Sequence, residues 1–231
     1  MERNLKAWYS KHRSQALFFF TPSRPFFLLV VGEKNCYYFG IVDTQKILKV
    51  IENIETPFKR QLLMVALITR ILEEKGKSPP IIIGGCALSY YSREVYFTSD
   101  IDLAYADRDA LNIVLTDIGF EKRGRYWVSE GLKMAIEAPT STPVGEDSPI
   151  EIVEVGEGLQ CRIIGIEDLI IERMNAFKHR KSEMDGEMVE LLIQKYRDEL
   201  DWAYLERKAA LPENDVFSEI LGLKQKPGNE E

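Results

Sequence analysis

The chain has 231 residues, 45% of them hydrophobic, which is enough for one domain with a real core or for a domain with an appended region, and excludes global disorder. Its formal net charge of -7 lacks the basic excess of a dedicated duplex nucleic-acid binder. Its three cysteines lie far apart, form no C-x-x-C pair and accompany only two histidines, a pattern that supports neither a zinc cage nor a disulfide framework and favours the reducing cytoplasm.

The first predicted elements precede any recognisable motif. Two prolines and an arginine interrupt the apolar stretch at residues 17–32, which predicts two strands around a proline turn instead of a membrane span or a signal peptide. Thr56 and Pro57 are typical of a helix start, and this helix is expected to end near Gly76. Because residues 62–68 are apolar on every side, the helix is expected to be buried.

The middle of the chain predicts a mixed sheet with helices between some of its strands. Strand-forming runs alternate there with turn residues and helix caps. The expected elements are a strand at 81–83, a helix at 87–92, a strand from about 100, a helix at 108–118 capped by Asp107, a hairpin at 125–138 and a strand at 150–155.

From Gly165 onward, apolar residues fall at three- and four-residue steps, which predicts helices as far as Pro212. The polar end of the chain is expected to be disordered. The predicted fold class is therefore α+β, with an N-terminal extension of uncertain structure at 1–55, a core at 56–160, a helical region at 161–222 and a tail at 223–231.

Two carboxylates in the strand near residue 100 suggest chemistry. Side chains alternate along a strand, so Asp100 and Asp102 share one face and repel each other unless a cation or a proton lies between them. Ligands that are all oxygen favour Mg²⁺ or Mn²⁺ over zinc. Gly84 and Gly85 stand at a strand-to-helix junction, where backbone N–H groups can approach a phosphate. Taken separately, the aspartates also fit a solvated strand end, and the glycines also fit a tight turn.

A third carboxylate would complete a site for phosphoryl chemistry. Strand alternation places Glu137 opposite an apolar face, just before a proline, and Glu151 is its rival on the following strand. Each of these glutamates also fits an exposed strand position. Arg93 could bind a phosphate with both guanidinium nitrogens, and it equally fits a salt bridge.

Three stretches, "IIIGGCAL", "SREVYFTSDIDL" and "YWVSEGLKMAIEAP", resemble in order and spacing the nucleotidyltransferase superfamily of the DNA polymerase β type. More narrowly, they resemble small prokaryotic nucleotidyltransferase-like proteins related to the AbiEii toxins. The resemblance covers residues 81–193, about half of the chain. It implies a nucleotidyltransferase-like mixed sheet flanked by helices, with a helical region after it.

The resemblance also implies residue roles. Asp100, Asp102 and Glu137, with Glu151 as the alternative third carboxylate, would be catalytic and would bind two Mg²⁺ or Mn²⁺ ions. The nucleotide-binding residues would be Gly84, Gly85, Cys86 and Arg93. Cys86 departs from the family pattern, because many members carry serine or threonine there.

The implied activity is transfer of a nucleoside monophosphate from an NTP to a hydroxyl of a protein, an RNA or a small molecule. One alternative is a catalytically weak nucleotide-binding module of a toxin–antitoxin pair. A second is a metal-dependent phosphohydrolase that uses the same carboxylates, and a third is a purely structural protein.

Overall fold

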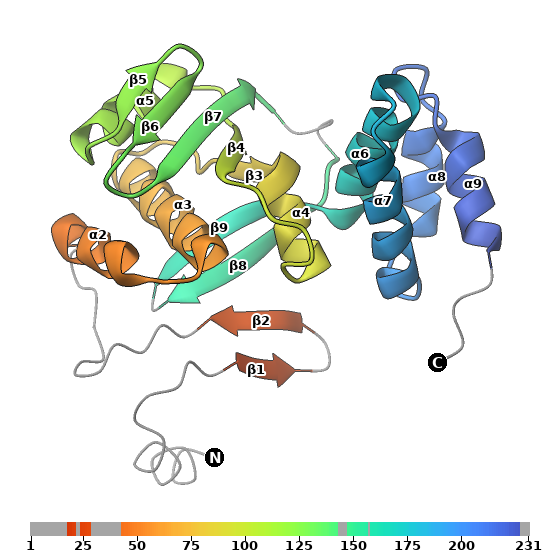
Figure 1. Cartoon of the computed structure of the whole chain (residues 1–231), viewed down its shortest axis with the longest axis horizontal. Coiled ribbons are helices and arrows are strands. Elements are labelled where there is room, and N and C mark those ends of the chain that lie inside the picture. The colour runs from red at the N-terminus through yellow and green to blue at the C-terminus, as the bar shows by residue number, and fades with distance from the viewer. Residues whose placement is uncertain (1–17, 22–23, 29–42, 143–146, 157, 227–231) are drawn as a thin grey trace, which may run out of the picture.

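The computed structural model describes residues 18–21, 24–28, 43–142, 147–156 and 158–226. These residues form a mixed β-sheet with helices packed on it and a group of helices at the C-terminal end (Figure 1). This arrangement confirms the predicted α+β fold class.

The described strands join in one sheet, in the order β1, β2, β8, β9, β3, β4, β7, β6 and β5. Strand β9 runs parallel to β3, and β4 runs parallel to β7, whereas β3 and β4 are antiparallel. The strands are β1 (Phe18–Thr21), β2 (Arg24–Leu28), β3 (Ile81–Ile83), β4 (Asp100–Ala104), β5 (Glu121–Arg123), β6 (Tyr126–Ser129), β7 (Met134–Thr140), β8 (Ile150–Gly156) and β9 (Leu159–Ile164). The two predicted N-terminal strands are confirmed as an antiparallel pair.

One face of the sheet is apolar and covered by helices. Ile82, Leu103 and Ile163 are neighbours across β3, β4 and β9 and are fully buried. Helix α3 (Pro57–Glu74) packs on β8 and β9 and contacts both α2 (Thr44–Asn53) and α5 (Arg108–Asp117). Because α3 touches the sheet on one side and helices on others, its apolar middle is buried all round, as predicted.

The opposite face of the sheet is more open. Ile152 is 57% exposed on β8, and Asp100 and Asp102 are partly exposed on β4. In a sheet with one packed and one open face, apolar and polar residues alternate along each strand. Strand β4 shows this alternation from Asp100 to Leu103. The carboxylates of β4 therefore point away from the core.

Four helices follow the last strand in the described chain. They are α6 (Ile166–Arg180), α7 (Glu183–Tyr196), α8 (Trp202–Ala209) and α9 (Phe217–Gln225). Helix α4 (Gly84–Ser92) contacts β3 and β4 as well as α6 and α7, so it joins the sheet to these helices. Among the described residues, no helix is both long enough and apolar enough to span a membrane.

Several boundaries differ from the predicted ones. Helix α4 begins at Gly84, not at Ala87, because both glycines adopt its first turn. Strand β9 crosses the predicted core boundary between residues 160 and 161, because it continues to Ile164 and the helical pattern begins only after Gly165. Helix α9 extends past residue 223, where the tail was predicted to begin, and the residues after 226 lie outside the described chain.

Candidate active site

Strands β4 and β7 bring three carboxylates to the open face of the sheet. In the parallel register of these strands, Asp100 lies beside Ala135, and Asp102 lies beside Glu137. Residues paired in this way project from the same face, and neighbouring strands lie about 4.8 Å apart. The sequence assigns Asp100 and Asp102 to one face of their strand, and the sheet register adds Glu137, which is buried, to the same face on the adjacent strand.

The glycine pair lies against these carboxylates. Gly84 has a φ of +61°, and a Cβ atom added to it would stand 2.3 Å from Oδ2 of Asp102. The backbone N–H of Gly85 donates a hydrogen bond to the Asp102 carboxylate. A Cβ atom on Gly85 would meet the side chain of Thr98 at 3.0 Å. Both glycines are therefore needed for the close approach of α4 to β4.

The N-terminus of α4 is directed at this cluster. The first four N–H groups of a helix have no partner inside the helix, and the helix dipole adds partial positive charge there. Helix α4 begins at Gly84, and the N–H of Gly85 in its first turn bonds the Asp102 carboxylate. The arrangement places an anion-binding helix end beside a group of acidic side chains.

Burial and mutual repulsion act on the Asp102 carboxyl. Burial, followed by the charge of Asp100, raises its pKa to about 6, against the lowering effect of the Gly85 N–H. Glu137 and Glu172 of α6 raise it further. Asp102 therefore carries negative charge that the protein compensates only in part, and a bound cation would relieve it.

The carboxylates of Asp100 and Glu137 contact other side chains of the protein. The Thr98 hydroxyl donates to Oδ1 of Asp100 at 2.5 Å, and Nε of Arg125 lies 3.4 Å from Oε2 of Glu137. With the side chains so placed, no group of three or more His, Cys, Asp or Glu residues within the described ranges surrounds a point where a metal ion could bind. The donor set is nevertheless all oxygen, the ligand type that Mg²⁺ and Mn²⁺ prefer.

The other site residues predicted from the sequence are Cys86, Arg93 and Glu151. Cys86 is fully buried, its thiol is directed to Oε1 of Gln61 at 3.9 Å, and burial raises the pKa of that thiol. Arg93 caps the opposite end of α4 with a φ of 56°, about 13 Å along the helix from Gly84. Glu151 lies on β8, separated from β4 by β9 and β3, or about 14 Å. The structure thus separates Arg93 and Glu151 from Asp100 and Asp102, whereas the buried Cys86 thiol lies near enough for the charges of both aspartates to add to the rise of its pKa.

Three residues not identified from the sequence adjoin the carboxylates. Thr98 contacts Asp100, Arg125 pairs with Glu137, and the charge of Glu172 acts on Asp102. Thr98 lies two residues before Asp100, so its hydroxyl could have been noticed from the sequence. The positions of Arg125 and Glu172 depend on strand pairing and helix packing between distant segments, which no local pattern records.

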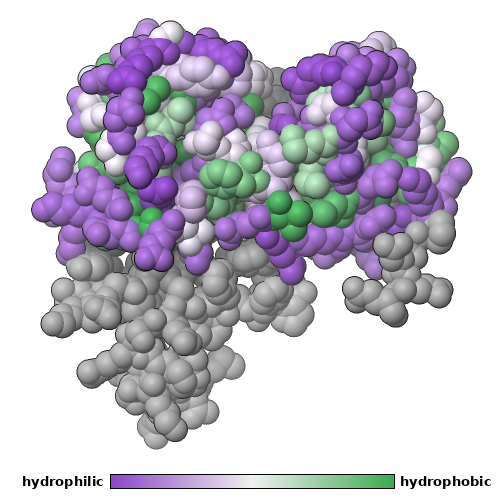
Figure 2. Space-filling view, in the orientation of Figure 1, coloured by the Kyte–Doolittle hydropathy of each residue, from purple (hydrophilic) through white to green (hydrophobic). Residues whose placement is uncertain are grey.

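Exposed apolar side chains also lie close to the site along the chain. Val95 is 65% exposed and Phe97 is 56% exposed, both in the loop between α4 and β4 that leads into Asp100. Tyr96 between them is partly buried and packs on the core, so the loop is anchored. In Figure 2, hydrophobic residues gather near the middle and lower part of a face that is otherwise largely hydrophilic.

Neither the protein-family models nor the curated proteins compared with the chain give a match. Among solved structures, the chain is similar to that of the antibiotic-resistance factor ANT(2'')-Ia. The identity is 18% and the TM-score 0.36, and the alignment covers 72% of this chain and 98% of that one. Since a TM-score this low does not establish a common fold, the functional interpretation depends on the geometry of the site itself.

Proposed function

We propose that this protein transfers a nucleoside monophosphate from an NTP to an acceptor hydroxyl with the help of divalent metal ions. One observation carries the proposal. The carboxylates of Asp100, Asp102 and Glu137 share the open face of adjacent strands, and the glycine-initiated N-terminus of α4 lies against them. Acidic metal ligands beside an anion-binding helix end are what a metal-bound triphosphate requires.

Each part of the site has a separate task in this reaction. The N-terminus of α4 would bind and orient the triphosphate, and the missing Cβ atoms of Gly84 and Gly85 let this helix end lie close to Asp102 and Thr98. Asp100, Asp102 and Glu137 would hold two Mg²⁺ or Mn²⁺ ions. When bound, these ions lower the pKa of the attacking hydroxyl and stabilise the leaving pyrophosphate.

The guanidinium of Arg125 also lies at the site. Its side chain is 70% exposed and pairs with Glu137 in the structure. The guanidinium also donates to the Tyr126 hydroxyl, so if Glu137 turned toward a metal ion, Arg125 would stay held by Tyr126 and could offer its remaining N–H groups to a phosphate or the acceptor. The ion pair thus keeps Glu137 partly neutralised until the metal and the nucleotide arrive.

The test is a turnover assay with each of the four NTPs, labelled at the α-phosphate, in the presence of Mg²⁺ and a cell extract as the source of acceptor. We expect pyrophosphate release and a labelled product from wild-type protein. The Asp100→Asn, Asp102→Asn double variant should lose both, and Glu151→Gln, a carboxylate substitution three strands away, should retain them.

The other outcomes separate the alternatives. Release of inorganic phosphate without a labelled acceptor would instead identify a phosphohydrolase. Nucleotide binding without any product, in extracts from several sources, would identify a regulatory module. Equal turnover by the double variant and wild type would overturn the assignment of the site.

A further inference from the structure

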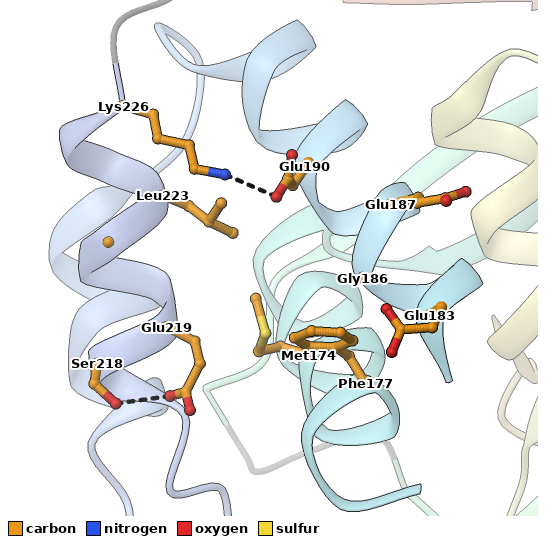
Figure 3. A pocket seen from close by; sticks show the side chains of 11 residues that line it. Met174, Phe177, Glu183, Gly186, Glu187, Glu190, Ser218, Glu219, Leu223 and Lys226 are labelled. Atoms are coloured by element: carbon orange, nitrogen blue, oxygen red, sulfur yellow. Dashed lines mark hydrogen bonds and ion pairs between the residues drawn. The ribbon is translucent and has the colours of Figure 1, made fainter. Parts of the chain in front are cut away.

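A groove of about 400 Å³ lies among the C-terminal helices, between α6, α7 and α9 (Figure 3). Its floor is apolar and is formed by Met174 and Phe177 of α6 and Leu223 of α9. Helix α7 contacts α9 on one side and α4 on the other. The groove is therefore lined by residues that take no part in the carboxylate site.

Two glycines shape the groove. Gly186 lies on α7, where an added Cβ atom would stand 2.7 Å from the ring of Phe177, so glycine allows the ring to lie flat against the helix. Gly222 lies on α9, and an added Cβ atom there would meet nothing within 4 Å. The position of Gly222 thus leaves open space that a larger side chain would fill.

The rim of the groove carries four glutamates. Glu190 pairs with Lys226 at 2.8 Å, and Glu219 pairs with Lys178 at 3.1 Å. For Glu183 and Glu187, no salt bridge occurs among the described residues. These two carboxylates are four residues apart on α7, a spacing at which like charges repel and destabilise a helix.

Exposed apolar side chains adjoin the groove in sequence. Met184 follows Glu183 on α7 and is 53% exposed, and Phe217 precedes Ser218 at the start of α9 and is 40% exposed. An apolar hollow whose edge carries two glutamates without a salt bridge among the described residues is typical of a protein-interaction surface.

We propose that this groove binds a segment of a partner protein in which an apolar side chain is flanked by lysine or arginine. The apolar side chain would occupy the floor, and the cations would pair with Glu183 and Glu187, relieving their repulsion. Residues 227–231 of the chain follow Lys226 and carry two glutamates and no basic residue, so their charge is wrong for this rim. The proposal is independent of the nucleotide-transfer activity.

The test uses a short fluorescein-labelled peptide in which leucine and tryptophan recur at helical spacing among lysines, and it follows fluorescence anisotropy. Wild-type protein should bind this peptide saturably, and a peptide with glutamate in place of lysine should not bind. Gly222→Met, which fills the open space and favours the helix, should weaken binding by roughly fivefold or more. The Glu183→Gln, Glu187→Gln double variant should weaken it similarly and reduce its salt dependence.

Matched controls separate docking from general attraction to an acidic protein. Gln225→Met adds a methionine to an exposed position of α9 outside the groove, and Glu52→Gln, Glu55→Gln removes two exposed charges beside α2. Both control variants should bind like wild type. Absence of peptide binding, equal binding by Gly222→Met, or equal binding of a lysine peptide without apolar residues would overturn the proposal.

Discussion

Gly84 is the residue whose backbone most directly shapes the site. Its φ of +61° is unfavourable for any residue with a Cβ atom, and that atom would collide with the Asp102 carboxylate at 2.3 Å. We expect Gly84→Ala to lower the free energy of unfolding by about 2 kcal/mol or more, from backbone strain and from displacement of Asp102. Urea denaturation would measure this change.

Gly124→Ala is the matched control, because Gly124 also has a φ of +61° but has nothing within 4 Å of an added Cβ atom. It should show only the strain of the left-handed backbone, about 1 kcal/mol. Equal losses for the two variants would mean that the contact between Gly84 and Asp102 carries no energy.

The raised pKa of Asp102 predicts a pH-dependent stability. The carboxyl titrates near 3.8 when unfolded and at about 6 when folded, so the folded state favours the protonated form. This contribution is fully present below pH 4 and is lost as the pH rises through 6. With a chelator present, Asp102→Asn should therefore be more stable than wild type at pH 7 to 8.

That advantage should shrink as the pH falls and should be absent near pH 3.5, where Asp102 is protonated in both states. Thermal unfolding of both proteins across this range is the measurement. A wild-type protein that is more stable than Asp102→Asn at pH 7.5 without metal would show that the carboxylate is already fully compensated.

Among the secondary-structure elements, strand β4 and helix α3 could be predicted because each has a local signature. Alternation in "DIDL" assigns Asp100 and Asp102 to one face, and the start of α3 is marked by Thr56 and Pro57. Strand β9 was not predicted, because its six residues lie between the strand pattern of β8 and the helical spacing that begins at Gly165. The pairing of Asp102 with Glu137 depends on long-range register, so the sequence left Glu137 and Glu151 as alternatives.

Strand position distinguishes these two glutamates experimentally. Glu137 pairs with Asp102 across neighbouring strands, whereas Glu151 is three strands away. If Glu137 acts at the reacting hydroxyl, Glu137→Gln should lower turnover by about 10²-fold or more while nucleotide binding changes little. Glu151→Gln should leave turnover and nucleotide binding unchanged. Steady-state kinetics of the two variants is the measurement, and a loss of turnover in Glu151→Gln but not in Glu137→Gln would contradict the assignment.

The middle of α3 is buried on all sides, so substitutions there are expected to be costly. Leu67 is fully buried. Leu67→Ala should lower the free energy of unfolding by about 2–5 kcal/mol through lost burial and a residual cavity. Arg70→Ala, on an exposed side of the same helix, should cost less than about 1 kcal/mol, because its pair with Glu74 is solvent-exposed. Similar losses from both substitutions in urea denaturation would contradict this packing.

In the whole molecule, the sheet and the C-terminal helices present different surfaces. The carboxylates lie on the open face of the sheet beside α4, and the acidic groove lies between α6, α7 and α9. A nucleotide and a basic protein segment could therefore bind without competing for the same residues. The sequence predicted the helical region but not this groove, since the groove arises from helices that meet only in the folded chain.

The most direct test of the central claim is calorimetric titration of each NTP into the protein with Mg²⁺. We predict saturable binding of at least one NTP to wild-type protein and to Glu151→Gln, and loss of that binding in a chelator or in Asp100→Asn, Asp102→Asn. Failure of every NTP to bind, or binding that is equally strong in the chelator and in the double variant, would contradict a metal–nucleotide site at Asp100, Asp102 and Glu137.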